Sequence, residues 1–249
     1  MRVMFSNGFQ LVYRADDRDP NDFHLLWKEE ALTMRRMGIA VHTTPLAESS
    51  LLMFRGGNDL VKAAYEQDVR YINGYAQMVQ YLKMSSYLPL IHDLSIPTFF
   101  TDELDREVIV EIEKRGWKKA FIKKDVKALE HIEEGKSVWP LTAFEEMKRL
   151  YAEMQIEGPF AIRQFVEKEV IEEEERYWVL NGNIYHRHNT VPDVVREAAR
   201  RLNKLGSRYY TIDATPQFVV EVNPGESSDR HAVNSAELFA SWIKKEFAS

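Results

Sequence analysis

The stretch FVVEVNPGE, residues 218–226, decides the fold predicted for this chain. Apolar residues surround Glu221, and Pro224 and Gly225 end the run, which is typical of a short buried strand that stops in polar residues. Because side chains alternate along a strand, Glu221 and Asn223 lie on one face. A carboxylate in an apolar run is costly to bury unless it is paired or holds a cation. The stretch therefore indicates a magnesium site, and the alternative is an edge-strand glutamate that points into water.

Length and composition limit the class of protein. The chain has 249 residues, of which 45% are hydrophobic and 29% charged, enough to bury a core in one or two domains. The formal net charge of -6 argues against a general nucleic-acid binder. Cysteine is absent, which excludes disulfides and thiolate metal sites. We find no signal peptide and no membrane span in the sequence, and we expect a cytoplasmic protein that binds neither nucleic acid nor membrane.

The first part of the chain predicts a parallel α/β unit. Apolar runs at residues 3–5, 39–42 and 50–54 predict strands, and residues 22–37 carry helical spacing. Strands that alternate with helices indicate a small, somewhat Rossmann-like parallel sheet. The pair Gly56–Gly57 lacks the spacing of a dinucleotide-binding loop, and we interpret it as a tight turn.

Further strands and helices are predicted along the rest of the chain. Pro97 restricts Ile96 to extended geometry, so a new substructure begins there. The predicted strands lie at residues 96–101, 117–123, 160–166 and 209–213, and the predicted helices at residues 75–85, 102–114, 141–154, 192–205 and 235–247.

A β-hairpin is predicted around Asn181–Gly182, because this dipeptide is the strongest signal for a two-residue turn. Such a turn pairs Leu180 with Asn183, and stepping outward places Arg176 opposite Arg187. Like charges that face each other are destabilising, whereas two guanidinium groups suit a phosphate or carboxylate bound between them. We therefore predict an anion site; the alternative is that both arginines point into water or meet nearby glutamates.

The loop before the opening stretch determines whether a third acidic ligand is present. If the loop is residues 215–217, Asp213 lies on the face of Glu221; a two-residue turn would place Asp213 on the opposite face. The acidic run at residues 172–175 is interpreted as mostly a solvated turn. His186 and His188 lack a third metal ligand with sensible spacing, so we interpret them as a polar strand end.

Several of these residues occur in an order that resembles the ATP-grasp superfamily. The resemblance rests on Tyr81-Leu82-Lys83, on Phe121-Ile122-Lys123-Lys124, and on Asp213 followed by Glu221-Val222-Asn223-Pro224. More narrowly, the chain looks like the small stand-alone ATP-grasp proteins of phages and bacteria distinguished by two arginines and a lysine. The resemblance implies an α/β (α+β) fold with a Rossmann-like pre-ATP-grasp domain at residues 1–94 and an ATP-grasp domain at residues 95–249. The lid subdomain would span about residues 95–165 and the metal-binding subdomain about residues 166–249.

The same resemblance implies ATP and Mg²⁺ as cofactors and assigns a role to each site residue. Lys83 and Lys123 would neutralise ATP phosphates, the segment Gln164, Phe165 and Val166 would hold adenine, and Glu167 or a later glutamate would lie near the ribose. Asp213, Glu221 and Asn223 would hold Mg²⁺, and Arg176 and Arg187 would stabilise the transferred phosphoryl group. Two departures stand out: the commoner pattern has an acid where Arg163 and Gln164 stand, and residues 125–137 are poor in the glycine and serine of a lid loop.

The activity implied by the resemblance is that of a carboxylate-amine ligase acting through an acyl phosphate. A kinase-like phosphotransferase and a catalytically inactive ATP-binding regulatory module are the alternatives, and an α/β interaction protein without a nucleotide site is a fourth. The carboxylate and the amine would come from a small molecule, a peptide or a protein terminus. The sequence indicates neither their identity nor the oligomeric state.

Overall fold

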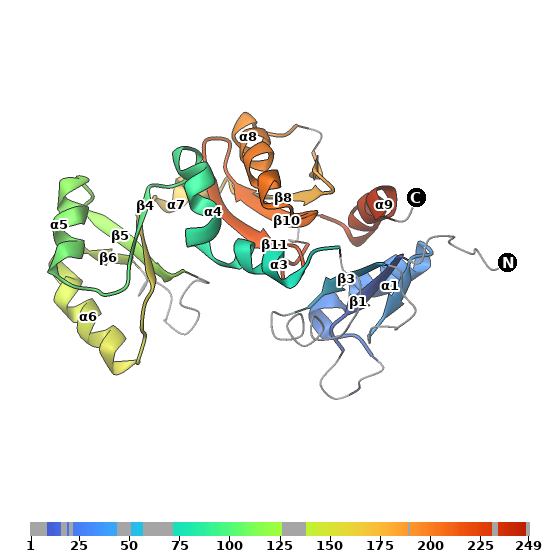
Figure 1. Ribbon diagram of the computed structural model, residues 1–249, viewed down its shortest axis with the longest axis horizontal. Helices are drawn as coiled ribbons and strands as arrows, with labels where there is room; N and C mark the ends of the chain where they lie inside the picture. The colour runs from blue at the N-terminus through green and yellow to red at the C-terminus, as the bar shows by residue number, and fades with distance from the viewer. Residues whose placement is uncertain are drawn as a thin grey trace.

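Three β-sheets follow one another along the long axis of the molecule (Figure 1). The computed structural model describes residues 9–15, 19, 22–43, 51–56, 72–125, 138–188, 190–230 and 234–247. The predicted mixed α/β class is confirmed, since each sheet is accompanied by helices. Among the described residues no helix is long and apolar enough to cross a membrane.

The N-terminal sheet is parallel and has the order β2-β1-β3. Its strands are β1 (Phe9–Tyr13), β2 (Ala40–His42) and β3 (Leu51–Arg55), and α1 (Leu25–Arg36) connects β1 to β2. The predicted helix and the second and third strands are confirmed. The predicted strand at residues 3–5 lies outside the described residues, and β1 was not predicted.

The central sheet is antiparallel and has the order β11-β10-β8-β9. Its strands are β8 (Glu175–Leu180), β9 (Asn183–Tyr185), β10 (Tyr209–Ala214) and β11 (Val219–Pro224). The helices α3 (Tyr75–Leu82), α4 (Met84–Ile91) and α8 (Asp193–Leu202) share a buried apolar cluster with one face of this sheet. The predicted domain boundary between residues 94 and 95 stays a prediction.

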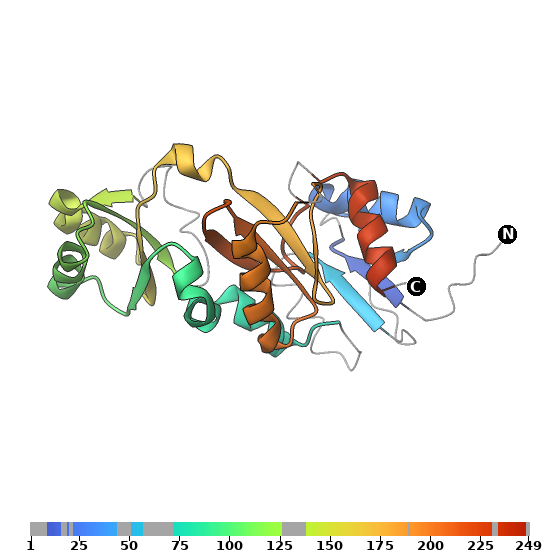
Figure 2. The same ribbon diagram turned by 90° about the horizontal axis from the view of Figure 1, so that it is seen from above.

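The opposite face of the central sheet is divided into an apolar and a polar half. Its apolar half, with Trp178, Leu180 and Tyr209, shares one core with the N-terminal sheet and with α9 (Ala236–Phe247). Figure 2 shows α9 lying beside α1 at the same end of the molecule as the described N-terminal strands. The polar half continues toward the third sheet and carries the predicted metal ligands.

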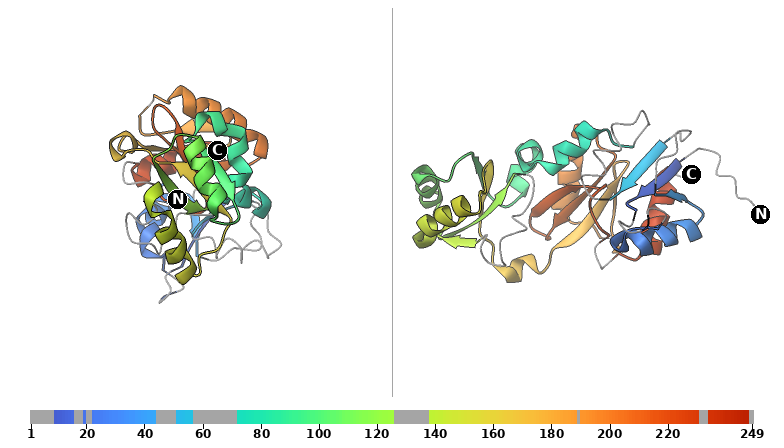
Figure 3. Two further views of the ribbon diagram at one scale, coloured as in Figure 1. Left: turned by 90° about the vertical axis from the view of Figure 1, so that its left-hand side faces the viewer. Right: turned by 90° about the horizontal axis from the view of Figure 1, so that it is seen from below.

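The third sheet is antiparallel, has the order β4-β7-β5-β6, and forms the far end of the molecule (Figure 3). Its strands are β4 (Thr98–Thr101), β5 (Lys119–Lys124), β6 (Val138–Pro140) and β7 (Phe160–Gln164). The helices α5 (Arg106–Lys114) and α6 (Phe144–Glu153) share its buried core, and α7 (Lys168–Ile171) leads back to β8. Short 3-10 helices lie at His92–Leu94, Leu141–Ala143 and Asn203–Leu205.

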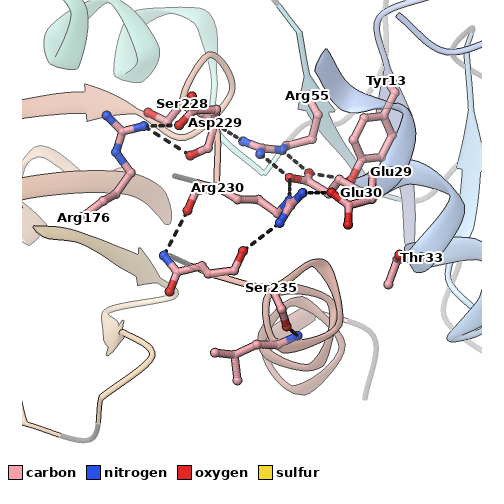
Figure 4. A network of polar contacts seen from close by, with 12 residues as sticks. Tyr13, Glu29, Glu30, Thr33, Arg55, Arg176, Ser228, Asp229, Arg230 and Ser235 are labelled. Atoms are coloured by element: carbon pink, nitrogen blue, oxygen red, sulfur yellow. Dashed lines mark hydrogen bonds and ion pairs between the residues drawn. The ribbon is translucent and has the colours of Figure 1, made fainter. Parts of the chain in front are cut away.

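A buried arginine joins the N-terminal sheet to the turn that follows β11 (Figure 4). Arg55 is fully buried, and its Nε and Nη2 donate to the Glu30 carboxylate at 2.7 and 2.8 Å. Its Nη1 donates to the carbonyl oxygens of Gly225, at 2.6 Å, and Ser228. A buried cation is tolerated only when it is paired and its donors are used. The position of the turn at residues 225–230 is therefore set by the N-terminal sheet.

Candidate active site

The polar half of the central sheet carries a row of charged side chains on three adjacent strands. Asp213 on β10 lies opposite Arg176 on β8 and opposite Glu221 on β11. Directly opposed residues point to the same face of an antiparallel sheet. Asp213 therefore shares the face of Glu221, the arrangement that the longer loop predicted. A register shift next to Asp213 accommodates the loop.

Asn223 completes a group of three oxygen-bearing side chains. Its Nδ2 lies 3.2 Å from Asp213 Oδ2 and 3.2 Å from Glu221 Oε2. Asp213 is nearly buried, whereas the side chain of Glu221 is 33% exposed. The three predicted metal ligands are thus brought together beside one accessible carboxylate.

Cationic side chains flank both carboxylates. Arg176 donates Nε and Nη2 to the two carboxylate oxygens of Asp213 at 2.7 and 2.8 Å, and Lys123 Nζ donates to Glu221 Oε1. Burial alone would raise the pKa of Glu221, but the charge and hydrogen bond of Lys123, with help from Asn223 and Arg163, hold it below its usual value. Glu221 is therefore ionised at neutral pH, as a metal ligand must be.

The donor set consists of oxygen atoms and fits a hard cation such as Mg²⁺. In the described part of the chain, no three His, Cys, Asp or Glu side chains are placed to share a metal ion. Two carboxylates and an amide remain, and Mg²⁺ is typically bound through one or two carboxylates with the other positions filled by water and phosphate oxygens. Asp213, Glu221 and Asn223 would hold such an ion.

An apolar cavity of about 310 Å³ adjoins the charged row. Phe121 lines the cavity, and Lys123, two residues further along β5, points to the same side of the strand and contacts Glu221. Val220, which precedes Glu221, also lines it. The complete lining consists of Ile96, Phe121, Arg163, Gln164, Phe165, Val166, Ile171 and Val220. A mostly apolar cavity of this size beside a polar row is typical of a small-molecule site.

Comparisons with known proteins identify the family of the chain. Residues 62–242 match the family described as ATP-grasp domain, R2K clade family 3. The chain belongs to this ATP-grasp family. No curated protein matches the chain.

The fold of the ATP-grasp chain is also found in solved structures of low sequence identity. The D-cycloserine synthetase DcsG has a TM-score of 0.65 and 15% identity, over 95% of this chain and 98% of that chain. The ATP-grasp ligase PsnB, complexed with minimal precursor, Mg and ADP, has a TM-score of 0.61 and 14% identity, over 96% and 97% of the two chains. The macrocyclase MdnC of Microcystis aeruginosa MRC, bound with precursor peptide MdnA, has a TM-score of 0.60 and 12% identity, over 95% and 99%.

The segment predicted to hold adenine lies at the cavity of the ATP-grasp chain. Gln164, Phe165 and Val166 line the cavity, whereas Glu167 is exposed and is not among the lining residues. Arg163, where the commoner pattern has an acid, is buried and donates Nη2 to the carbonyl oxygen of Val220 at 2.8 Å. It therefore links β7 to β11 at the cavity wall.

Lys83, which was predicted to lie within a helix, lies between α3 and α4 instead. Lys83 has φ -97° and ψ 114°, which ends α3 and precedes α4. The prediction of one helix over residues 75–85 is therefore wrong at this position, because the main chain turns there to meet Asp125 at the end of β5. Lys83 is exposed. Its role at the ATP phosphates remains a prediction.

The two predicted catalytic arginines do not face each other. The hairpin pairs Leu180 with Asn183, as predicted, but β9 ends at Tyr185, before the ladder reaches Arg187. Arg187 instead donates Nη2 to Glu175 Oε1 at 2.8 Å, the alternative in which an arginine meets a glutamate. Arg176 alone lies in the charged row. The prediction that Arg176 and Arg187 face each other across the ladder is therefore wrong.

Two acidic residues near Arg176 were missed by the sequence analysis, and Figure 4 shows one of them, Asp229. Asp229 Oδ1 accepts from Arg176 Nη1 at 2.7 Å, so the turn after β11 helps to orient the guanidinium. Burial, reinforced by the charges of Asp213 and Glu221, raises the pKa of Glu174 to about 7. Glu174 lies directly before β8 and two residues before Arg176, and this spacing was the available signal.

The remaining interpretations concern the other face of the sheet and the loop after β5. His186 is buried, with Nε2 3.4 Å from Glu175 Oε2, so it contributes to a polar strand end as interpreted. The segment at residues 126–137, where a lid loop was sought, lies outside the described residues.

Proposed function

We propose that the chain is an ATP- and Mg²⁺-dependent carboxylate-amine ligase that acts through an acyl phosphate. One observation carries the proposal. The strand β5, which carries Phe121 and Lys123, joins an apolar cavity of about 310 Å³ to a row of two carboxylates, an amide and an arginine. An ATP molecule with its adenine in the cavity would extend its phosphates along this row, because the lining residues Phe121 and Val220 adjoin Lys123 and Glu221.

Each group in the row has work that suits its chemistry. Lys123 and Lys83 neutralise phosphate oxygens as compact charges, and Asp213, Glu221 and Asn223 hold Mg²⁺. When bound, the ion neutralises charge that develops on the phosphates. Arg176 presents a planar guanidinium held by two carboxylates, so it is already oriented toward the transferred phosphoryl group. Arg187 follows the end of β9 and is paired with Glu175, so it would reach the same anion by leaving that pair.

The reaction has two displacements. The substrate carboxylate attacks the γ-phosphorus, which releases ADP and forms the acyl phosphate. The amine then attacks the acyl carbon, phosphate leaves, and an amide remains after the amine loses a proton. Positioning and charge neutralisation supply most of the catalysis, and no protein nucleophile is needed.

Peptides are the substrates to try first. The macrocyclase MdnC has been solved with a precursor peptide, and PsnB with a minimal precursor. These similarities support peptide carboxylates and amines as the substrate class of this chain, ahead of free amino acids.

Nucleotide and metal binding is tested by thermal shift with ATP in the presence and absence of Mg²⁺. Binding to the folded state alone raises the melting temperature, by an amount that grows with ligand concentration. We expect the Mg²⁺-dependent part of the shift to disappear in Glu221→Gln. The matched control is Glu111→Gln, because Glu111 is 32% exposed and paired with Arg115 at 2.7 Å, far from the row. If ATP with Mg²⁺ does not change the melting temperature of the wild-type chain, every nucleotide-based function is excluded.

The reaction is tested by ADP release across peptide and amino-acid mixtures, followed by mass analysis. A ligase gives a new amide together with ADP and phosphate. A phosphorylated substrate without an amide would identify the kinase-like alternative. ATP binding without turnover of any mixture would identify the regulatory module.

A further inference from the structure

Asp125 is a buried carboxylate that joins the end of β5 to the start of α4. Its Oδ1 accepts from the Ser85 N–H at 2.6 Å, and its Oδ2 accepts from the Ser85 hydroxyl at 2.5 Å. Its carbonyl oxygen accepts from the Met84 N–H at 2.9 Å, and its own N–H donates to the carbonyl of Pro159 at 3.1 Å. Every polar group of this residue is therefore used, and two of the partners are N–H groups of the first turn of α4.

The same contact lies between the two lysines assigned to the phosphates. Lys123 is two residues before Asp125 on β5, and Lys83 directly precedes Met84. The main chains that carry both lysines are thus tied together by the hydrogen bonds of one side chain and its carbonyl. The lysines come from segments 40 residues apart in sequence, as the Ser85–Asp125 separation shows.

A fixed main chain matters for lysine more than for arginine. A lysine is a point charge on a flexible stem, so its position relative to a phosphate depends on where the stem begins. Two lysines on independently moving segments would lose freedom each time ATP bound, and this loss would weaken affinity. Segments already joined do not incur that loss.

We propose that Asp125 is a positioning residue for the triphosphate, which holds Lys83 and Lys123 at one spacing so that both reach the phosphates of the same ATP molecule. This inference rests on the proposed function. It concerns binding of the phosphate chain and not of adenine, because Asp125 does not line the apolar cavity.

The test compares dissociation constants for ATP and for adenosine by isothermal titration calorimetry. Asp125→Asn replaces one acceptor by an NH₂ group that faces a donor, and the milder Ser85→Ala removes only the hydroxyl bond. We expect each variant to weaken ATP by roughly tenfold, the scale of one charge-assisted hydrogen bond, and to change adenosine by less than about twofold. The ratio of the two constants is the readout, since a general loss of folded protein lowers both affinities.

The matched control is Asp105→Asn. Asp105 also caps a helix with its carboxylate, accepting from the N–H groups of Glu107 and Val108 at the start of α5, but no assigned lysine adjoins it. We expect its ATP-to-adenosine ratio to equal that of the wild type. Equal weakening of ATP and adenosine by Ser85→Ala and Asp125→Asn, or ATP binding unchanged in both, overturns the positioning role. A wild-type chain that binds adenosine no more weakly than ATP overturns the phosphate site itself, and a chain that binds neither overturns the proposed function.

Discussion

We expect Glu226 to make the stability of this protein fall as pH rises from about 4.5 to about 7. The residue lies in the turn after β11 and is 2% exposed. Asn73 donates Nδ2 to its Oε1 at 2.8 Å, while its Oε2 has no hydrogen-bond partner among the described residues. Burial raises the pKa of Glu226 from its ordinary value of 4.5 to about 7, against smaller opposing contributions from its hydrogen bonds and from Arg55.

The sign and size of the effect follow from proton linkage. Below pH 4.5 the carboxyl is protonated in both the folded and the unfolded chain, so its full contribution to stability is present. As pH rises, the unfolded chain loses the proton first, and stability falls until the folded carboxyl also ionises near pH 7. At 1.36 kcal/mol for each pKa unit, the wild-type chain loses about 3 kcal/mol over this range.

The variant Glu226→Gln keeps the side-chain shape and removes the titration. We expect the free energy of unfolding of the variant minus that of the wild type to rise by about 3 kcal/mol between pH 4.5 and pH 8. At pH 8 the corresponding gain in melting temperature is roughly 6 to 12 °C for a chain of this length. Urea unfolding at several pH values measures the difference, in which all other titrating groups cancel.

The matched control is Glu153→Gln, which removes one charge from an exposed position on α6. The free energy of unfolding of this variant minus that of the wild type should not change with pH. If the free energy of unfolding of Glu226→Gln minus that of the wild type were also constant between pH 4.5 and pH 8, the buried titration of Glu226 would be refuted.

Three further substitutions test the packing and the site. Arg55→Lys removes a planar fork from a fully buried position, and we expect a loss of about 3 to 5 kcal/mol in urea unfolding, so a loss below about 1 kcal/mol would contradict the buried role. Gly225→Ala places a Cβ 2.6 Å from the ring of Tyr209 and should cost about 1 to 3 kcal/mol, whereas a wild-type melting temperature would mean that the turn relaxes freely. Arg187→Ala breaks a partly exposed pair with Glu175 and should change stability by under about 1 kcal/mol. Its ligase turnover should nevertheless fall on the order of a hundredfold, and full turnover would exclude Arg187 from the catalytic set.

The site could be predicted where local patterns carry the information. Alternation placed Glu221 and Asn223 on one face, and the Asn181–Gly182 turn predicted the first pairs of the hairpin correctly. The sequence did not decide on which face of the sheet Asp213 lies. A register shift at one residue moves every later side chain to the other face, and that shift depends on the loop. Only the folded sheet decides it.

Contacts between distant segments could not be predicted from the sequence. The sequence predicts a strand at residues 50–54, directly before Arg55, but not the partners of Arg55, which are Glu30 and the carbonyl oxygens of Gly225 and Ser228. β1 was missed because Gln10 interrupts its apolar run, although Leu11 and Tyr13 are buried by elements far along the chain. The prediction that Arg176 and Arg187 face each other was wrong because β9 ends at Tyr185. The length of such a short edge strand is set by tertiary packing and not by its turn.

The core shared by the N-terminal sheet and α9 also bears on how the chain is made. Synthesis runs from the N-terminus, so β1, β3 and α1 leave the ribosome well before residues 236–247, which cover part of their apolar surface. Contacts between such distant segments form slowly, and the uncovered surface is prone to aggregation in the interval. β1, β3 and α1 are therefore synthesised before the helix that covers them, and residues 1–94 expressed alone should depend on chaperones or precipitate.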